Sequence, residues 1–377
     1  MTAVAATIHD RSADGSDDQR DRTTRASAPR AISRGRPKDP IAETLPPGHR
    51  VGAWQIVSEL GRGGMGAVYA VTHHGFGKRA ALKVCHASVL RTELSAETFL
   101  REARVVHLID HPGVCDVFAT GTFGGRPYLA MERLYGQTLG HLVHRRLVGH
   151  DRALELLIEL CDILSAAHSA GVVHRDLKLD NVFVLDRPGA GGYQIKLVDW
   201  GVAHVMREHD PLQGMIVGTL TYVAPEQARG EPITPAADVY SLAVLAYQLL
   251  FQRPPFRSDD DIELIQHHLY SPPPPPNDLW PEIPAELAEL LTRMLSKQPE
   301  DRPCLAEVEY VLRHARLQTR PCRPAHVTPS WLAHLTSVAR FDVLGRPVFG
   351  FATRPRLVGA TLTLACAIAC IASLFGV

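Results

Sequence analysis

Strand patterns fill the first part of the folded region, and helical patterns fill the rest. Short runs rich in β-branched and aromatic residues cover Trp54–Leu60, Ala67–Val71 and Arg79–Val84, with a glycine cluster between the first two. Short strands separated by turn signals are typical of an antiparallel sheet. We therefore expect the fold to begin with a β-rich lobe.

Helical patterns follow the strands. Residues 95–109 place apolar side chains on one stripe, and a second helix is expected from Asp151, as its N-cap, to the residue before Gly171. Residues 238–251 are apolar on nearly all sides and too short to cross a bilayer, which predicts a buried core helix. A β-rich segment followed by a helical one predicts an α+β fold with two lobes and a cleft between them.

The N-terminal segment and the overall charge set further limits. Residues 1–50 are rich in Asp, Arg, Ser, Thr and Pro and poor in large apolar side chains, so we expect a disordered tail without a signal peptide. The sequence contains 40 basic and 40 acidic residues, and this balance gives no reason to expect nucleic-acid binding. The seven cysteines are scattered without a CxxC pair, which favours reduced thiols over a disulfide framework or a zinc site.

An uncharged stretch of 21 residues covers Leu357–Val377. As a helix it would reach about 31 Å, enough for the hydrocarbon core of a bilayer. Arginines precede it and, by the positive-inside rule, predict that the folded domain stays on the cytoplasmic side. These arginines are Arg340, Arg346, Arg354 and Arg356. We expect a C-terminal transmembrane helix, with 317–356 as a juxtamembrane linker. The alternative is a hydrophobic helix that packs on the folded domain.

A glycine-rich stretch, Gly61–Val68, lies between the first two predicted strands and contains the pattern GxGxxG. Dinucleotide-binding folds share this pattern, but there the glycines open a helix, whereas here a strand follows. Glycines at the tip of a hairpin let backbone N–H groups approach phosphate oxygens. Lys83 on the next strand is suited to hold phosphates, with Glu102 as its candidate carboxylate partner. The alternative is an ordinary glycine-rich turn and two surface charges.

Three polar motifs follow along the chain. They are His174-Arg175-Asp176-Leu177-Lys178-Leu179-Asp180-Asn181, Asp199-Trp200-Gly201 and Ala224-Pro225-Glu226. In this order and spacing the chain resembles the eukaryotic-like, or Hanks-type, serine/threonine protein kinases of bacteria, over roughly residues 54–316. The resemblance implies the two-lobed protein kinase fold, with a β-rich N-lobe over 54–134 and a helical C-lobe over 135–316.

The resemblance also implies a division of chemical roles, because phosphoryl transfer depends on positioning and charge neutralisation. Asp176 would accept the proton of the substrate hydroxyl, with Thr219 supporting it. Lys178 would contact the γ-phosphate of ATP. Asn181 and Asp199 would bind two Mg²⁺ ions.

The nucleotide would lie between the lobes. Lys83, paired with Glu102, would hold the α- and β-phosphates of ATP. Met131 would be the gatekeeper beside adenine, and the backbones of Glu132 and Leu134 would bond the base. The full nucleotide-binding set implied by the resemblance is Leu60, Gly61, Arg62, Gly63, Gly64, Met65, Gly66, Ala67, Val68, Ala81, Lys83, Met131, Glu132, Leu134, Phe183 and Asp199.

Other residues are implied to be structural. In the family Asp238 anchors the catalytic loop, which here is 174–181, and Glu226 pairs with Arg302. Trp200 replaces the Phe that is usual between Asp and Gly. The larger side chain either disfavours an inactive arrangement or strains the site.

The segment 199–226, which we call the activation segment, lacks the usual phosphorylation sites. No Ser, Thr or Tyr occurs between Gly201 and Gly218. Relatives often carry phosphothreonines there, and Arg175 would be their partner. We expect control through Thr221, or activity without phosphorylation of this segment.

The leading hypothesis is an active, non-specific serine/threonine protein kinase that uses ATP and Mg²⁺ on protein substrates. It would be tail-anchored in the inner membrane of a bacterium, with the kinase domain in the cytoplasm. The alternative is a nucleotide-binding pseudokinase scaffold, motivated by Trp200 and the hydroxyl-free segment. A small-molecule phosphotransferase is a third hypothesis, against which Ala224-Pro225-Glu226 and Gly218-Thr219 argue.

Overall fold

The computed structural model describes residues 44–87, 93–206, 208, 210, 212 and 218–319, and the backbone of 340–341 and 347–348. The chain divides into two units, Met1–Arg320 and Pro321–Val377. The first unit carries the fold discussed below. In the second, strands β12 (Arg340–Phe341) and β13 (Pro347–Val348) pair as an antiparallel ribbon.

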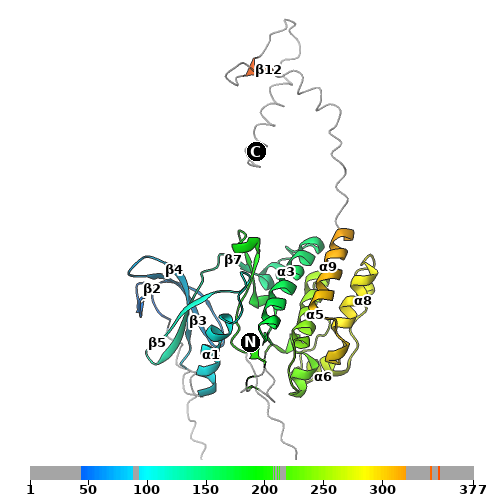
Figure 1. Ribbon diagram of the computed structural model, residues 1–377, viewed down its shortest axis with the longest axis horizontal. Coiled ribbons are helices and arrows are strands. Elements are labelled where there is room, and N and C mark those ends of the chain that lie inside the picture. Colours follow the sequence, from blue (N-terminus) through cyan, green and yellow to red (C-terminus); the bar gives the residue numbers. More distant parts are fainter. Residues whose placement is uncertain are drawn as a thin grey trace, which may run out of the picture. The chain divides into compact units, whose positions relative to one another are not determined.

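A six-stranded antiparallel sheet forms the first lobe (Figure 1). Its strands lie in the order β1-β2-β3-β4-β6-β5. They are β1 (Arg50–Val51), β2 (Trp54–Arg62), β3 (Gly66–His73), β4 (Arg79–Cys85), β5 (Val117–Phe123) and β6 (Arg126–Met131). Helix α1 (Glu93–Val106) lies against β5 and β6. The three strands predicted to begin at Trp54, Ala67 and Arg79 are confirmed as β2, β3 and β4.

Apolar side chains on one face of this sheet make a small core of their own. Trp54, Ile56, Tyr69 and Leu82 are buried there. Strand β2 alternates buried and exposed residues at its start, as a strand with one face toward water should. The core holds β3 and β4 in register, and that register places Val68 opposite Lys83.

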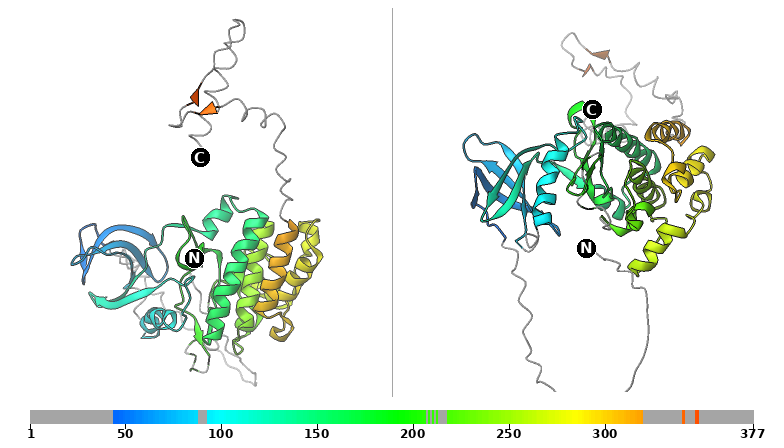
Figure 2. Two further views of the ribbon diagram at one scale, coloured as in Figure 1. Left: turned by 45° about the horizontal axis from the view of Figure 1, so that its top comes forward. Right: turned by 60° about the horizontal axis from the view of Figure 1, so that its bottom comes forward.

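Helices make up the second lobe (Figure 2). They are α2 (Leu139–His144), α3 (His150–Ser169), α4 (Pro225–Arg229), α5 (Ala236–Phe251), α6 (Asp261–Tyr270), α7 (Pro276–Leu279), α8 (Ala285–Met294) and α9 (Leu305–Thr319). Helix α3 packs on α5 and α9, and α5 packs on α8. Nearly every residue of α5 is buried, which confirms the predicted core helix. The two lobes confirm the α+β prediction.

The predicted N-cap of α3 was wrong. Gly149 occupies the cap position, and Asp151 lies in the first turn. The Asp151 carboxylate accepts a hydrogen bond from Arg316 Nε (3.0 Å), and this contact joins α3 to α9. A carboxylate in a first helical turn is still favourable because it faces the positive end of the helix dipole.

Two small sheets in the second lobe hold the polar motifs. Strand β8 (Val172–Val173) pairs with β11 (His204–Val205), and a three-stranded sheet joins β7 (Gly136–Thr138), β9 (Val182–Leu185) and β10 (Ile195–Leu197). Single 3₁₀ turns follow at η2 (Leu179–Asn181), η3 (Ala190–Gly192), η4 (Leu220–Tyr222) and η5 (Pro299–Asp301). The catalytic loop therefore runs from β8 through η2 to β9, and Asp199 follows β10 closely.

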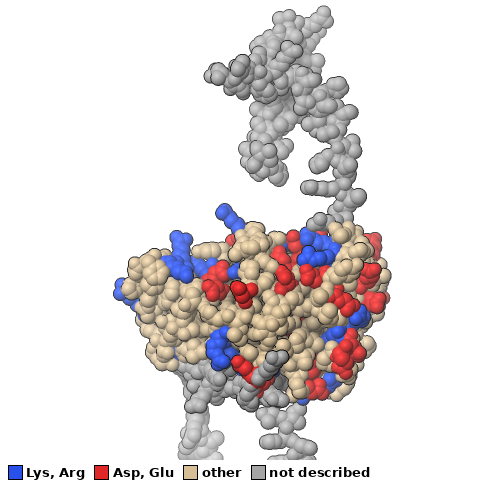
Figure 3. All heavy atoms as spheres, viewed as in Figure 1, with Lys and Arg blue, Asp and Glu red and all other residues tan. Residues whose placement is uncertain are grey.

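Two predictions fall largely or wholly outside the described residues. The predicted transmembrane span 357–377 lies beyond them, as does most of the tail predicted over 1–50. Within the part of the chain that the structure describes, no helix combines the length and the apolarity needed to span a bilayer. Figure 3 shows acidic and basic side chains interspersed over the viewed face of the first unit.

Candidate active site

One buried carboxylate fixes the start of the catalytic loop. Asp238, in the first turn of α5, accepts hydrogen bonds from the backbone N–H groups of His174 (2.8 Å) and Arg175 (3.0 Å). His168 Nε2 lies 2.8 Å from the same carboxylate. Burial alone would raise the pKa of Asp238, but the hydrogen bond and charge of His168 lower it below the ordinary value. Arg175 takes a positive φ of 69° in this arrangement, so the loop turns sharply at the residue before Asp176.

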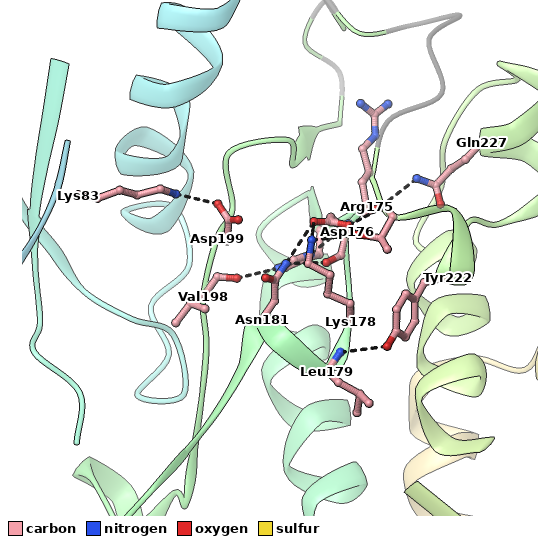
Figure 4. Close-up of polar contacts among 12 residues, drawn as sticks. Lys83, Arg175, Asp176, Lys178, Leu179, Asn181, Val198, Asp199, Tyr222 and Gln227 are labelled. Atoms are coloured by element: carbon pink, nitrogen blue, oxygen red, sulfur yellow. Dashed lines mark hydrogen bonds and ion pairs between the residues drawn. The ribbon is translucent and has the colours of Figure 1, made fainter. Parts of the chain in front are cut away.

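Both oxygens of Asp176 are held by donors (Figure 4). The N–H and the hydroxyl of Thr219 donate to Oδ1 at 2.9 and 3.0 Å. Lys178 Nζ donates to Oδ2 at 2.6 Å and also to Thr219 Oγ1 at 3.0 Å. Asn181 Nδ2 donates to the main-chain oxygen of Asp176 at 2.8 Å. These donors together fix the orientation of the carboxylate.

Lys83 lies between two carboxylates from different parts of the chain. Its Nζ is 2.7 Å from Glu102 Oε2 on α1 and 2.8 Å from Asp199 Oδ1 after β10. Burial opposes the charged ammonium, but the two carboxylates outweigh it and raise the pKa of Lys83. The positive charge of Lys83 in turn lowers the pKa of Asp199. At neutral pH the site therefore holds a cation and an anion 2.8 Å apart.

Trp200 packs beneath the catalytic loop. Its indole is 1% exposed and meets the His174 ring edge-on, with centroids 4.5 Å apart. The indole Nε1–H donates to Leu197 O at 3.3 Å, so the buried polar atom is satisfied. Asp199, the preceding residue, has φ 64°, and its side chain is 39% exposed. The larger ring is thus accommodated while the carboxylate faces Lys83.

The glycines of the β2–β3 hairpin differ in what they permit. A Cβ on Gly66 would lie 2.3 Å from Val84 O, so only glycine lets β3 approach β4 at this point. A Cβ on Gly61 or Gly63 would have no atom of the described residues within 4 Å. Arg62, at the end of β2, pairs with Glu59 at 2.7 Å. Close packing therefore requires glycine at position 66 but not at 61 or 63.

The segment that joins the lobes begins after β6. Met131 is buried and lies opposite Ala81 on β4. The Glu132 N–H donates to Asp116 O at 2.8 Å, while its carbonyl oxygen receives a contact from Cys115 Sγ at 3.9 Å. Phe183 lies on β9, opposite Lys196.

Sequence reasoning missed three contributors to this region. Lys196 is buried on β10 and forms a 2.7 Å ion pair with Glu132. Gln227 Nε2 donates to Arg175 O at 3.0 Å, and Asp210 pairs with the Arg175 guanidinium. A single Lys, Gln or Asp carries no motif, so no signal in the sequence could have found these residues.

A buried ion pair closes the base of the activation segment. Arg302 donates to both carboxylate oxygens of Glu226 at 2.7 Å, and the two side chains are 0% and 1% exposed. This is the pair that the family resemblance implied. It ties helix α4 to the turn before α9.

No group of three or more His, Cys, Asp or Glu side chains that could hold a metal ion occurs among the described residues. Mg²⁺ bound with substrate phosphates uses one or two protein ligands and needs no such group. Asn181 and Asp199 fit that need. The side-chain nitrogen of Asn181 donates to Asp176, so the side-chain oxygen of Asn181 is not used in that bond. Lys83 contacts one oxygen of Asp199, Oδ1.

Comparisons with known proteins agree with the motifs. Residues 54–315 match the family described as Protein kinase domain. The chain is 40% identical to the serine/threonine-protein kinase Pkn1 of Myxococcus xanthus over 295 residues, which cover 76% of this chain and 42% of Pkn1. It is 32% identical to the serine/threonine-protein kinase PknA of Mycobacterium tuberculosis, over 74% of this chain and 64% of PknA.

Solved structures agree as well. A crystal structure of the Mycobacterium tuberculosis PknI kinase domain aligns with a TM-score of 0.58 and 27% identity, and covers 72% of this chain and 99% of that domain. The chain spans less than half the length of Pkn1 and of pkn3 from Myxococcus xanthus. The family match extends over most of the chain, and the chain belongs to the protein kinase family, among the bacterial Hanks-type serine/threonine kinases.

Proposed function

We propose that this chain transfers the γ-phosphate of ATP to serine or threonine hydroxyls of proteins. The observation that carries the proposal is the convergence of Lys83, Asp176 and Asp199, from β4, the catalytic loop and the end of β10, in one site between the lobes. The names of the relatives, which are serine/threonine-protein kinases, support the same activity.

Lys83 would hold the phosphates of ATP. Its two carboxylate partners keep it charged and fix its position, and an ammonium held in place costs no reorganisation when substrate arrives. Asn181 and Asp199 would hold Mg²⁺, which supplies charge neutralisation on the transferred phosphate when bound. The second oxygen of Asp199 supports the proposal of Mg²⁺ binding because Lys83 bonds only the first.

Asp176 would orient the incoming hydroxyl and accept its proton. The donors Thr219, Lys178 and Asn181 fix the carboxylate before substrate binds. Lys178 bonds Asp176 and Thr219 in this structure, and it is long enough to turn to the γ-phosphate of a bound nucleotide. A preorganised base and a fixed cation supply the positioning that phosphoryl transfer requires.

The pseudokinase alternative loses the part of its motivation that came from Trp200. Trp200 packs under the loop without moving Asp199 away from Lys83. The site contains all the polar residues that the reaction requires, so phosphate transfer is the function that the geometry supports best.

The decisive experiment measures transfer from radiolabelled ATP with Mg²⁺ to a generic basic protein by the full chain. We expect phosphoserine or phosphothreonine in the product. Asp176→Asn should remove the acceptor for the hydroxyl proton, and Lys83→Met should remove the phosphate cation. Each variant should lose transfer while circular dichroism shows an unchanged fold. Undiminished labelling by either purified variant rejects the assignment.

We further propose that Leu357–Val377 crosses the inner membrane once and leaves the kinase domain in the cytoplasm. The support is its length without charge and the arginines before it. The full chain should stay in bacterial membranes through an alkaline carbonate wash, and a chain ending at residue 356 should appear in the soluble fraction. Recovery of the full chain in the soluble fraction would refute this proposal.

A further inference from the structure

The side chain of Arg175 turns away from Asp176 toward the activation segment (Figure 4). There it meets Asp210. Nη1 donates to Asp210 Oδ1 at 3.1 Å, and Nη2 donates to Oδ2, so the contact is a two-pronged ion pair. The two side chains are 5% and 8% exposed. The Leu212 N–H also donates to Asp210 Oδ1, at 3.0 Å, which fixes the carboxylate from its own segment.

Two further basic groups surround this pair. Arg101 on α1 is 8% exposed, and its Nη2 has no hydrogen-bond partner among the residues that the structure describes. The Nδ1 atom of His204 on β11 is buried and likewise meets no partner within the described part of the chain. The pKa of His204 is lowered by burial and by the charges of Arg175 and Arg101, while Asp210 acts in the opposite sense. The imidazole of His204 is therefore neutral at pH 7, and Asp210 is a buried carboxylate beside the positive charges of the catalytic loop and α1.

Such a cluster needs an anion. A buried guanidinium without a partner is strongly unfavourable, whereas a carboxylate in bidentate geometry satisfies it. A phosphorylated hydroxyl would serve the same purpose with a larger charge. Between Gly201 and Gly218, however, the sequence offers no Ser, Thr or Tyr to carry a phosphate. Asp210 supplies a permanent negative charge at this place.

The backbone of Arg175 links its ion pair with Asp210 to the catalytic residue Asp176. Its N–H is held by Asp238 and its carbonyl oxygen by Gln227, at 3.0 Å each. The next residue is Asp176. A shift of the Arg175 side chain would therefore pull on a loop whose geometry depends on the hydrogen bonds around Asp176 and Thr219.

We propose that Asp210 is a positioning residue that holds the activation segment against the catalytic loop in the unphosphorylated chain. It takes the place that a phosphate on this segment would fill. The consequence for activity rests on the proposed kinase function. Its consequence for structure does not, because the ion pair should order both segments whether or not phosphate is transferred.

The chain offers a matched control. Glu208 lies two residues before Asp210 in the same segment, but its side chain is 48% exposed and 3.8 Å from Arg104. Asp210→Asn and Glu208→Gln each remove one negative charge and keep the side-chain shape. Asp210→Glu keeps the charge at the buried position. Only the first should release Arg175.

Two measurements on the full chain test the proposal. Hydrogen exchange of peptides covering 174–181 and 204–206 should become faster in Asp210→Asn and stay unchanged in Glu208→Gln. The kcat for a protein substrate should fall by roughly 10- to 100-fold in Asp210→Asn, because a catalytic group displaced by about 1 Å costs this much. KM for ATP should stay close to that of the parent, and Asp210→Glu should recover part of kcat. The parent should keep its activity after phosphatase treatment.

Unchanged exchange in Asp210→Asn overturns the proposal, as does an equal effect of Glu208→Gln. Loss of parental activity on phosphatase treatment overturns it too, because a phosphate would then be required. If the parent transfers no phosphate but Asp210→Asn still exchanges faster, the kinase assignment fails and the positioning role of Asp210 stands.

Discussion

Lys196 Nζ lies 2.7 Å from Glu132 Oε2, and this ion pair joins β10 in the second lobe to the first residue after β6. Lys196 also donates to Val114 O at 3.3 Å. The lysine side chain is 7% exposed, whereas that of Glu132 is 39% exposed. The buried Lys196 thus holds Glu132, which lies in the segment expected to bind adenine.

We predict that Lys196→Met raises KM for ATP several-fold and changes kcat little. The methionine keeps the apolar stem but releases Glu132, so the segment loses the position that binding requires, while Asp176 and its donors stay in place. The free energy of unfolding should fall by about 1–3 kcal/mol, because the Val114 carbonyl loses its partner. Initial rates over a range of ATP concentrations give the two constants. A large fall in kcat at unchanged KM would contradict this role.

Removal of one partner from the buried pair Glu226–Arg302 should strongly destabilise the second lobe. Arg302→Met leaves the Glu226 carboxylate buried without its partner, which costs about 3–5 kcal/mol. Arg313 is a matched control, since it pairs with Glu309 at 2.5 Å but is 61% exposed. Arg313→Met should change the free energy of unfolding by about 0.5 kcal/mol or less. Urea denaturation of both variants measures the difference, and equal losses would refute the argument from burial.

Gly66 and Gly63 should respond differently to the same substitution. Gly66→Ala brings a methyl group to 2.3 Å from Val84 O, so β3 and β4 must separate. We expect a loss of about 1–3 kcal/mol in the free energy of unfolding and a raised KM for ATP. Gly63→Ala has open space around the new methyl group and should leave stability nearly unchanged. Thermal denaturation of the two variants in parallel tests this prediction. A Gly66→Ala protein as stable as the parent would show that β3 and β4 can separate at this point without loss of stability.

Local patterns predicted the elements, while long-range pairings stayed hidden. Alternation and helical stripes depend on neighbours in sequence, so β2, β3, β4 and α5 could be predicted from their residues. The Lys196–Glu132 and Arg175–Asp210 contacts span 64 and 35 residues. Lys196, Glu132 and Asp210 belong to no motif with a known spacing, and the motif that contains Arg175 does not give the position of its partner. Only the folded chain therefore brings each pair together. Asp151 shows the same limit. Its partner Arg316 lies 165 residues away, and the helix begins at His150, two residues earlier than an N-cap at Asp151 would place it.

The buried His268 should make the stability of the second lobe depend on pH. This residue of α6 is 0% exposed, and Tyr240 Oη lies 3.0 Å from its Nδ1. Burial, aided by the charge of Lys297, lowers the pKa of His268 to about 3 from 6.5. Below about pH 6.5 the unfolded chain therefore binds a proton that the folded chain excludes, so stability falls as the pH is lowered.

We expect this histidine to remove about 1.4 kcal/mol for each unit of pH below about 6. In His268→Leu the free energy of unfolding should fall less steeply between pH 6.5 and 4.5, whatever its value at pH 7, because no imidazole remains to take up the proton in the unfolded state. His314→Leu removes an exposed histidine of α9 and should keep the slope of the parent. Urea denaturation at half-unit steps of pH measures these slopes. Parallel curves for the parent and His268→Leu would show that the imidazole does not stay neutral inside the folded lobe.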